Sequence, residues 1–177
     1  TNTDVANCGS CSSLCAPPNA TPTCDAGVCG IAMCNAGFAD CDGIPNNGCE
    51  VNLNTSVGNC GSCGNVCNLA NASESCVAGM CGIATCNAGF GNCDGLTPNG
   101  CETNLNSSVG NCGTCGNACD LANSNEGCSA GACTVVSCEA GFGNCDGLTP
   151  NGCETNTNTS VGNCGTCGNA CDLANSN

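Results

Sequence analysis

The chain has 177 residues, 27 of them cysteine, and a net charge of −14, with no lysine, arginine or histidine. Nucleic acids and anionic membranes recruit proteins through lysine and arginine, so this composition excludes both as partners. It also removes the bases and cations of nucleophilic and phosphate-handling active sites. We therefore expect no enzymatic activity.

Leucine, isoleucine, valine and phenylalanine together make up only 24 residues, a composition typical of chains that do not fold around an apolar core. Disulfides can replace that core, since each contributes roughly 2–4 kcal/mol. Disulfides at this density persist only in oxidising compartments, which predicts an extracellular or cell-surface location. No apolar stretch approaches the roughly 18 residues of a membrane span, so no membrane insertion is expected.

The cysteines recur with a period of 52 residues, the pattern of a tandem array. Each full period carries eight cysteines at one spacing, and the second and third periods are identical at 37 of 52 positions. The period divides the chain into the end of a preceding linker, three full repeats and a partial fourth, namely 1–7, 8–59, 60–111, 112–163 and 164–177. The predicted fold class is a linear tandem array of small disulfide-rich repeats.

Within a repeat, no segment shows helical periodicity over the roughly 8–20 residues of a globular helix. At most, residues 69–71 and their copies form a single turn. Short β-strands are expected around residues 81–86, followed by a turn at Gly89 and Phe90. Asp-Gly and Asn-Gly pairs further along each repeat favour tight turns. We therefore expect mostly coil and turns with short β-hairpins and no substantial helix.

The first motif of chemical interest is Asn-Cys-Gly-x-Cys followed, after three intervening residues, by a third cysteine, and it begins at Asn7, Asn59 and Asn111. Thiolates at this spacing bind zinc or iron–sulfur clusters. The competing interpretation is structural, because the glycines allow a tight turn around cross-links and eight thiolates would lack a basic environment. A redox role would need a βαβ context that the chain does not have.

The second motif is an acidic loop containing Cys-Asp-Gly and ending in Asn-Gly-Cys-Glu. Its oxygen ligands and tight turns favour a weak calcium site, although the glycine and glutamate are displaced from their places in an EF-hand loop. The alternative is a hairpin clamped by its own cysteines. The candidate ligands are Asp42, Asn47 and Glu50; Asp94, Asn99 and Glu102; and Asp146, Asn151 and Glu154. No cofactor is required, and calcium is the one candidate.

The pairing of eight cysteines cannot be fixed from spacing alone, and neighbouring repeats can also be bridged. The bends between Cys41 and Cys49 bring these two residues together, which predicts a disulfide Cys41–Cys49. Its copies are Cys93–Cys101 and Cys145–Cys153. Because the spacing repeats, we expect the same pairing in every repeat, with at least 24 of the 27 cysteines oxidised.

Asn-x-Ser/Thr occurs at the same point of each linker, at Asn54, Asn106 and Asn158. These are candidate N-glycosylation sites, and Asn19 and Asn71 carry the same motif. The alternative is coincidence in linkers rich in asparagine, serine and threonine.

The Cys-rich motif at 59–67 together with the later Cys-x2-Gly-x-Cys at 76–81 resembles the motif of stigma-specific secreted proteins of plants. With the acidic loop included, the repeats are more similar to tandem cysteine-rich repeats of large secreted and surface proteins of bacteria such as myxobacteria. This resemblance covers essentially the whole chain. It implies secretion and disulfide-stapled architecture, and it implies no particular activity.

These observations favour a non-enzymatic extracellular structural protein that forms a rod, fibre or filament. The partial repeat at 164–177 and the linker end at 1–7 predict association with itself, head to tail, or continuation in a longer array. Glycans are the other expected partners. The alternatives are a calcium-dependent cell-surface adhesion or ligand-binding stalk and a protein that sequesters metals through thiolates.

Overall fold

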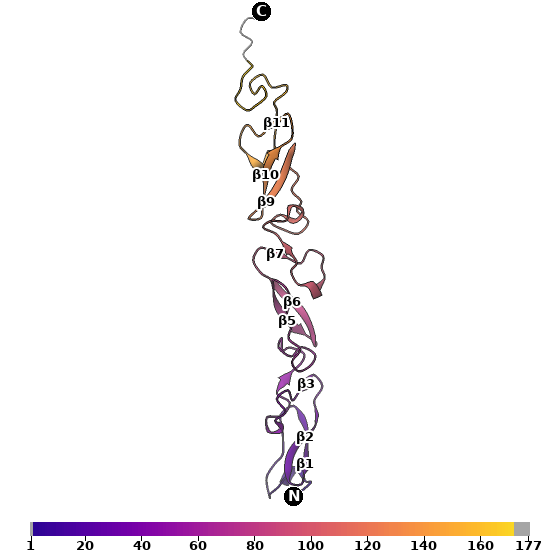
Figure 1. Cartoon of the computed structure of the whole chain (residues 1–177). Coiled ribbons are helices and arrows are strands. Elements are labelled where there is room, and N and C mark those ends of the chain that lie inside the picture. Colours follow the sequence, from indigo (N-terminus) through magenta and orange to yellow (C-terminus); the bar gives the residue numbers. More distant parts are fainter. Residues whose placement is uncertain (1, 172–177) are drawn as a thin grey trace, which may run out of the picture. The chain divides into compact units, whose positions relative to one another are not determined.

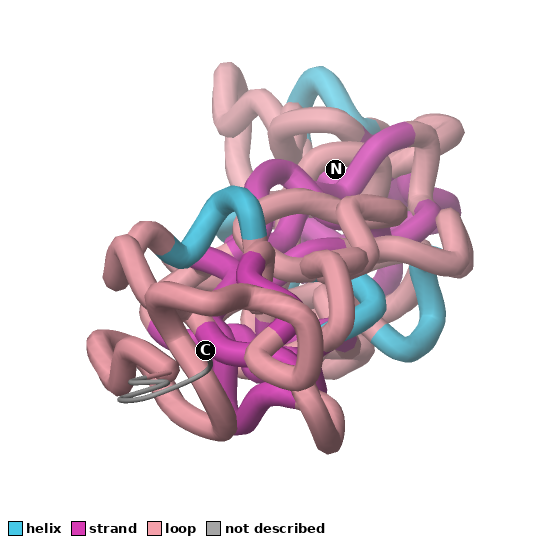
Figure 2. Tube along the Cα trace, turned by 90° about the horizontal axis from the view of Figure 1, so that it is seen from above, coloured by secondary structure: helices cyan, strands magenta, loops and turns pink. Residues whose placement is uncertain are grey.

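A computed structural model of the protein describes residues 2–171. By their contacts these residues form two compact units, one within residues 1–85 and one within residues 86–177. Loops make up most of the chain, with short strands and single helical turns between them (Figure 2). This confirms the predicted fold class of small disulfide-rich repeats built from coil and short hairpins.

The elements of the first unit are the 3₁₀ helix Val5–Asn7, β1 (Ala20–Asp25), β2 (Val28–Cys34), β3 (Phe38–Ala39), the 3₁₀ helix Pro45–Asn47, β4 (Val51–Asn52), β5 (Ala72–Val77) and β6 (Met80–Cys86), whose last residue already belongs to the second unit. The second unit contains β7 (Phe90–Gly91), the 3₁₀ helix Thr97–Asn99, β8 (Thr103–Asn104), the 3₁₀ helix Val109–Asn111, β9 (Ser124–Ser129), β10 (Ala132–Cys138), β11 (Phe142–Gly143), the 3₁₀ helix Thr149–Asn151 and β12 (Thr155–Asn156). The strands β1, β5 and β9 begin 52 residues apart, so the sequence period is also a structural period.

Each repeat contains a long hairpin, formed by β1 and β2, by β5 and β6, and by β9 and β10 (Figure 1). The strand predicted around residues 81–86 is therefore confirmed as β6. A two-residue turn joins β1 to β2, with φ of 52° at Ala26 and 82° at Gly27, and two positive φ values match the right-handed twist of the strands. The register places Cys24 directly opposite Cys29.

A second, shorter sheet follows each long hairpin and pairs β3 with β4, β7 with β8, and β11 with β12. Each ladder has only two residue pairs, such as Phe38 with Asn52 and Ala39 with Val51. The residues between the two strands form the acidic loop, which comprises 40–50, 92–102 and 144–154 in the three repeats. Each acidic loop carries one of the 3₁₀ turns.

Cysteine forms the interior of this protein. The buried apolar residues among those described are ten cysteines, five of which have less than 2 % of their surface exposed. Large apolar side chains such as Leu14, Val28 and Met33 are instead about 70 % exposed. Disulfides therefore occupy the place of the apolar core, as the composition predicts.

The part of the chain that the structure describes contains no α-helix. Among those residues, no helix is long and apolar enough to cross a membrane.

Candidate functional site

Three disulfides lie within each full repeat, joining its first cysteine to the fourth, its third to the fifth and its sixth to the eighth. They are Cys8–Cys24, Cys15–Cys29 and Cys34–Cys49, then Cys60–Cys76, Cys67–Cys81 and Cys86–Cys101, and finally Cys112–Cys128, Cys119–Cys133 and Cys138–Cys153. The first two of each set fasten the long hairpin to the loop before it. The third fastens the end of the hairpin to the acidic loop.

A fourth disulfide joins the seventh cysteine of each repeat to the second cysteine of the next. These junction disulfides are Cys41–Cys63, Cys93–Cys115 and Cys145–Cys167. Together with Cys164–Cys171, they bring the total among residues 2–171 to 13 disulfides and leave one free cysteine. The expectation that at least 24 cysteines are oxidised is thus met, and the pairing repeats in all three full repeats.

The predicted disulfide Cys41–Cys49 and its copies Cys93–Cys101 and Cys145–Cys153 are wrong. The eighth cysteine is held away from the seventh because its backbone N–H donates to the chain before the long hairpin, as from Cys49 to the Pro18 carbonyl at 2.9 Å. Cys49 is fully buried at this position and pairs with Cys34. The seventh cysteine stays at the edge of the loop, where the next repeat reaches it.

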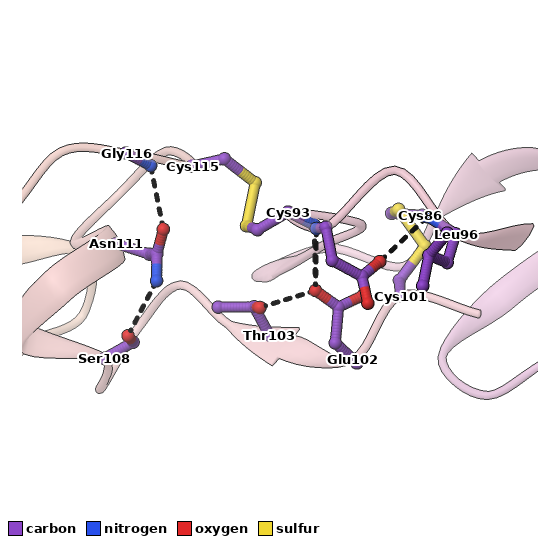
Figure 3. Close-up of a disulfide and its surroundings, with 11 residues drawn as sticks. Cys86, Cys93, Leu96, Cys101, Glu102, Thr103, Ser108, Asn111, Cys115 and Gly116 are labelled. Atoms are coloured by element: carbon purple, nitrogen blue, oxygen red, sulfur yellow. Dashed lines mark hydrogen bonds between the residues drawn. A yellow bond between two sulfur atoms is a disulfide. The ribbon is translucent and has the colours of Figure 1, made fainter. Parts of the chain in front are cut away.

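Figure 3 shows the junction around Cys93–Cys115, whose Cα atoms lie 5.2 Å apart. On one side, the carboxylate of Glu102 accepts hydrogen bonds from the N–H of Cys93 at 2.9 Å and the hydroxyl of Thr103 at 2.9 Å. On the other side, the side-chain oxygen of Asn111 accepts the N–H of Gly116 at 2.8 Å. The disulfide thus joins two loops that are each fixed by their own hydrogen bonds.

The loop that carries the second cysteine is here called the junction loop, and it comprises 7–15, 59–67, 111–119 and 163–171. Its backbone docks onto the linker before it, since Gly113 N–H donates to Leu105 O at 2.9 Å and Cys119 N–H donates to Val109 O at 2.8 Å. Linker, junction loop and junction disulfide therefore form one cross-linked region between successive repeats.

The candidate glycosylation sites lie in these linkers, and Asn54, Asn106 and Asn158 are all exposed. Their amide nitrogens face a glycine of the preceding turn. A Cβ built on Gly89, for example, would lie 2.1 Å from the side-chain nitrogen of Asn106. In this conformation the nitrogen that would carry a glycan points toward the protein, so an attached glycan requires the side chain to turn outward.

The structure brings the predicted calcium ligands of each acidic loop together, but it uses them as internal hydrogen-bond partners. In the first repeat, the two oxygens of Asp42 accept the N–H of Ile44 at 2.9 Å and the side-chain N–H of Asn47 at 2.8 Å. Glu50 accepts the N–H of Cys41 at 3.0 Å. Asn47 therefore acts as a hydrogen-bond donor that orients the carboxylate of Asp42.

The same hydrogen bonds lower the pKa of several of these carboxyls. The N–H of Ile44 and then the side chain of Asn47 hold the pKa of Asp42 below its usual value, and Leu148 and Asn151 do the same for Asp146. The pKa values of two glutamates are also lowered, in each case first by the residue's own backbone N–H: Glu102 and Glu154. Each hydrogen bond favours the charged form.

Sequence reasoning did not include Asp40 among the candidate ligands. In the first repeat, one oxygen of each of Asp40, Asp42 and Glu50 lies within 4.8 Å of the others. The second and third repeats have Asn92 and Asn144 at this position, and the side-chain oxygen of each is buried without a hydrogen-bond partner.

Two groups of three sulfurs, those of Cys60, Cys67 and Cys81 and those of Cys112, Cys119 and Cys133, also lie within 4.8 Å of one another. All of these sulfurs belong to disulfides, so they are not thiolates here.

Cys11 is exposed and is the one free cysteine among the described residues. Its counterparts Cys63, Cys115 and Cys167 all form junction disulfides. The junction loop around Cys11 nevertheless has the same conformation, with Ser12 N–H donating to the Asn7 side chain at 2.8 Å. The loop therefore keeps this conformation without a junction disulfide.

Comparison of the chain with protein-family models, with curated proteins and with solved structures finds no match.

Proposed function

We propose that this chain is a non-enzymatic, extracellular structural protein that forms a rod, fibre or filament of repeats and associates with itself end to end. The observation that carries this proposal is the junction disulfide, which makes neighbouring repeats covalently continuous by a route outside the backbone. The disulfide density supports an oxidising location outside the cell. A load-bearing or protective role would use this continuity directly.

The disulfides also keep the chain in one covalent piece after a protease has cut its backbone. A cut after Glu102 falls between Cys93 and Cys115, so the junction disulfide still holds the two pieces together. Each of the six glutamates is bypassed by at least one disulfide in the same way: Glu50, Glu74, Glu102, Glu126, Glu139 and Glu154. A protein that persists outside the cell benefits from such bypasses.

Digestion with a glutamate-specific protease tests this part of the proposal. Complete cleavage should leave a single species without reductant, and it should yield separate peptides after reduction. The Cys93→Ser/Cys115→Ser variant should split in two at Glu102 without reductant. Release of pieces from the unreduced wild-type chain would overturn the covalent continuity on which the proposal depends.

End-to-end association would use Cys11. Its thiolate attacks the sulfur of Cys145 in a second copy, a new disulfide forms between the copies, and Cys167 leaves as a thiolate. No oxidant is consumed, because one disulfide replaces another. The incoming junction loop is backed by the disulfides Cys8–Cys24 and Cys15–Cys29, whereas the loop that it displaces is closed, among residues 2–171, by Cys164–Cys171 alone.

Incubating the full chain at rising concentration in a glutathione buffer tests the association. We expect a ladder of covalent multimers without reductant, and peptide mapping should find Cys11 joined to Cys145. The Cys11→Ser variant should remain monomeric. Monomers at every concentration, or a Cys11–Cys11 dimer that grows no further, would contradict head-to-tail growth.

A calcium-dependent adhesion stalk is the second candidate, favoured by the three clustered carboxylates of Asp40, Asp42 and Glu50. Calcium prefers oxygen ligands of this kind, and millimolar affinity is sufficient outside the cell. Calcium should then raise the melting temperature more than magnesium does, and Asp40→Asn should weaken this response. No heat in calorimetry at millimolar calcium would exclude the site.

N-glycosylation at Asn54, Asn106 and Asn158 is proposed because these exposed side chains recur at one point of every linker. A glycan would add solubility to a chain without lysine or arginine. Treatment of the native protein with an N-glycosidase should lower its mass, and an unchanged mass would contradict the assignment.

A further inference from the structure

One junction-loop sequence occurs twice in the chain with two different disulfide pairings. Residues 111–125 and 163–177 have the same sequence. In the third repeat, the first and third cysteines pair with the long hairpin as Cys112–Cys128 and Cys119–Cys133. In the partial fourth repeat, the same two positions pair with each other as Cys164–Cys171.

The backbone of the junction loop is the same in both states. In the third repeat, the hydrogen bonds run from Cys112 N–H to Asn117 O at 2.7 Å, from Gly116 N–H to the Asn111 side chain at 2.8 Å and from Cys119 N–H to Val109 O at 2.8 Å. In the fourth, they run from Cys164 N–H to Asn169 O at 2.5 Å, from Gly168 N–H to the Asn163 side chain at 2.7 Å and from Cys171 N–H to Val161 O at 2.8 Å. The loop can therefore change its disulfide without refolding.

The sulfurs of the full repeat are also placed for such a change. Those of Cys112, Cys119 and Cys133 lie within 4.8 Å of one another although the first two are not bonded to each other. Cys128 and Cys133 face each other across the hairpin. Four cysteines thus have a second self-consistent pairing, in which the loop and the hairpin each close their own disulfide.

We propose that each junction loop first closes a disulfide between its first and third cysteines, and that the long hairpin then docks by disulfide exchange. In the third repeat, Cys112–Cys119 and Cys128–Cys133 convert to Cys112–Cys128 and Cys119–Cys133. This exchange takes place within one repeat and does not depend on association between chains.

The atoms and electrons of this exchange balance when a thiol such as glutathione acts as the catalyst. Its thiolate attacks Cys133 and releases the Cys128 thiolate, which attacks Cys112 and releases the Cys119 thiolate. Cys119 then attacks Cys133 and expels the catalyst. Two disulfides are present before and after, so neither oxidant nor reductant is consumed.

Burial gives the exchange its direction. The first cysteine is half-buried at Cys164, in the loop closed by Cys164–Cys171, but only 1 % exposed at Cys112. The third cysteine changes in the same sense, from exposed at Cys171 to half-buried at Cys119 and 6 % exposed at Cys67. Removing these sulfurs from water stabilises the docked pairing.

Removing the hairpin cysteines from the full chain tests the first state. In the Cys128→Ser/Cys133→Ser variant, we expect Cys112 and Cys119 to pair with each other while Cys93–Cys115 is retained, and titration of the denatured variant should find no more free thiols than in wild type. The unaltered second repeat of the same chain is the internal control. Free thiols at Cys112 and Cys119, or pairing of either with another repeat, would overturn the proposal.

Oxidative refolding of the reduced wild-type chain tests the exchange. Samples are alkylated at intervals and mapped without reduction. Cys112–Cys119 should rise first and then decline while Cys112–Cys128 increases, with the number of free thiols unchanged during the second phase. Removing free glutathione after the first phase should halt the conversion. Direct formation of Cys112–Cys128, with no Cys112–Cys119 at any time, would refute the order of events.

Discussion

Cys41 of the first repeat is disulfide-bonded to Cys63 of the second, with their Cα atoms 5.4 Å apart. The residues between them include the end of the acidic loop, the strand β4 and the linker, so this whole segment is enclosed in a covalent loop. Closing a loop of this length contributes on the order of 3 kcal/mol in the chain-entropy description. The linker, polar and without a core of its own, is stabilised in this way.

Cleavage at methionine should test the disulfide Cys67–Cys81 and the absence of a disulfide across Met33. The chain has two methionines, and both are about 70 % exposed. Met80 lies between Cys67 and Cys81, so cleavage there leaves the pieces joined. Met33 lies between Cys29 and Cys34, where none of the disulfides of residues 2–171 passes over the cut. Cyanogen bromide without reductant should therefore release only residues 1–33.

The matched control for this cleavage is the Met33→Leu variant, which should remain a single covalent species after the same treatment. Separation of the chain at Met80 without reductant would contradict Cys67–Cys81. Retention of residues 1–33 on the wild-type chain would contradict the first-repeat pairing.

Mild reduction should open the junction disulfides before those inside the repeats. The second cysteine of each junction loop is exposed at Cys63, Cys115 and Cys167, whereas Cys49 and Cys60 are fully buried. A reductant reaches an exposed sulfur more readily. Brief treatment of the native chain with a phosphine, followed by alkylation and mapping, should label the junction cysteines first.

The order of reduction should disappear in concentrated guanidinium chloride, because unfolding exposes all disulfides alike. Cys164–Cys171 should open early together with the junctions, since Cys171 is also exposed. Equal labelling of buried and junction cysteines in the native chain would refute this prediction.

Two glycines of one acidic loop should respond differently to alanine. Gly147 and Gly152 have φ of 73° and 72°, so alanine at either position meets a backbone cost of roughly 1–2 kcal/mol. A Cβ at Gly147 has nothing within 4 Å, whereas one at Gly152 would lie 2.4 Å from the carbonyl oxygen of Ala122. That carbonyl accepts the N–H of Cys153 at 2.7 Å.

Gly152→Ala should therefore lower the free energy of unfolding at least twice as much as Gly147→Ala, as measured by denaturant unfolding without reductant. It should also slow formation of Cys138–Cys153 during refolding. Equal effects of the two substitutions would show that the close approach of Gly152 to Ala122 does not limit stability.

The sequence predicts the repeat period, the strand at residues 81–86 and the replacement of an apolar core by disulfides, because spacing, local residue pattern and composition determine them. The junction disulfides could not be predicted. Each repeat has an even number of cysteines, so no residue is left over to indicate a bond to a neighbour. Cys41 is also nearer in sequence to Cys49 than to Cys63, and only the contact of Cys49 with Pro18 shows why the nearer partner is excluded.

The arrangement of the candidate calcium ligands can be predicted in part. Asp42, Asn47 and Glu50 do meet in one loop, because Asp-Gly and Asn-Gly turns fold it back on itself. Whether Asn47 faces Asp42 with its oxygen or its nitrogen depends on the rotation of one amide, which spacing does not encode. The contribution of Asp40 arises from the short ladder of β3 and β4, which places it beside Glu50.

Acidification should weaken the acidic loops. The folded pKa of Asp146 is lowered by the N–H of Leu148 and the side chain of Asn151, so the unfolded chain takes up a proton at higher pH than the folded one. The resulting stability is present above the unfolded pKa of roughly 4 and is lost as pH falls through the folded value.

Asp146→Asn should therefore slightly lower the melting temperature at pH 7 and reduce its further fall on acidification. The control is Asp120→Asn, an exposed carboxylate, which should change neither quantity in thermal unfolding followed by circular dichroism. A wild-type melting temperature that stays constant down to pH 2 would contradict the assignment of these hydrogen bonds to the charged carboxylate.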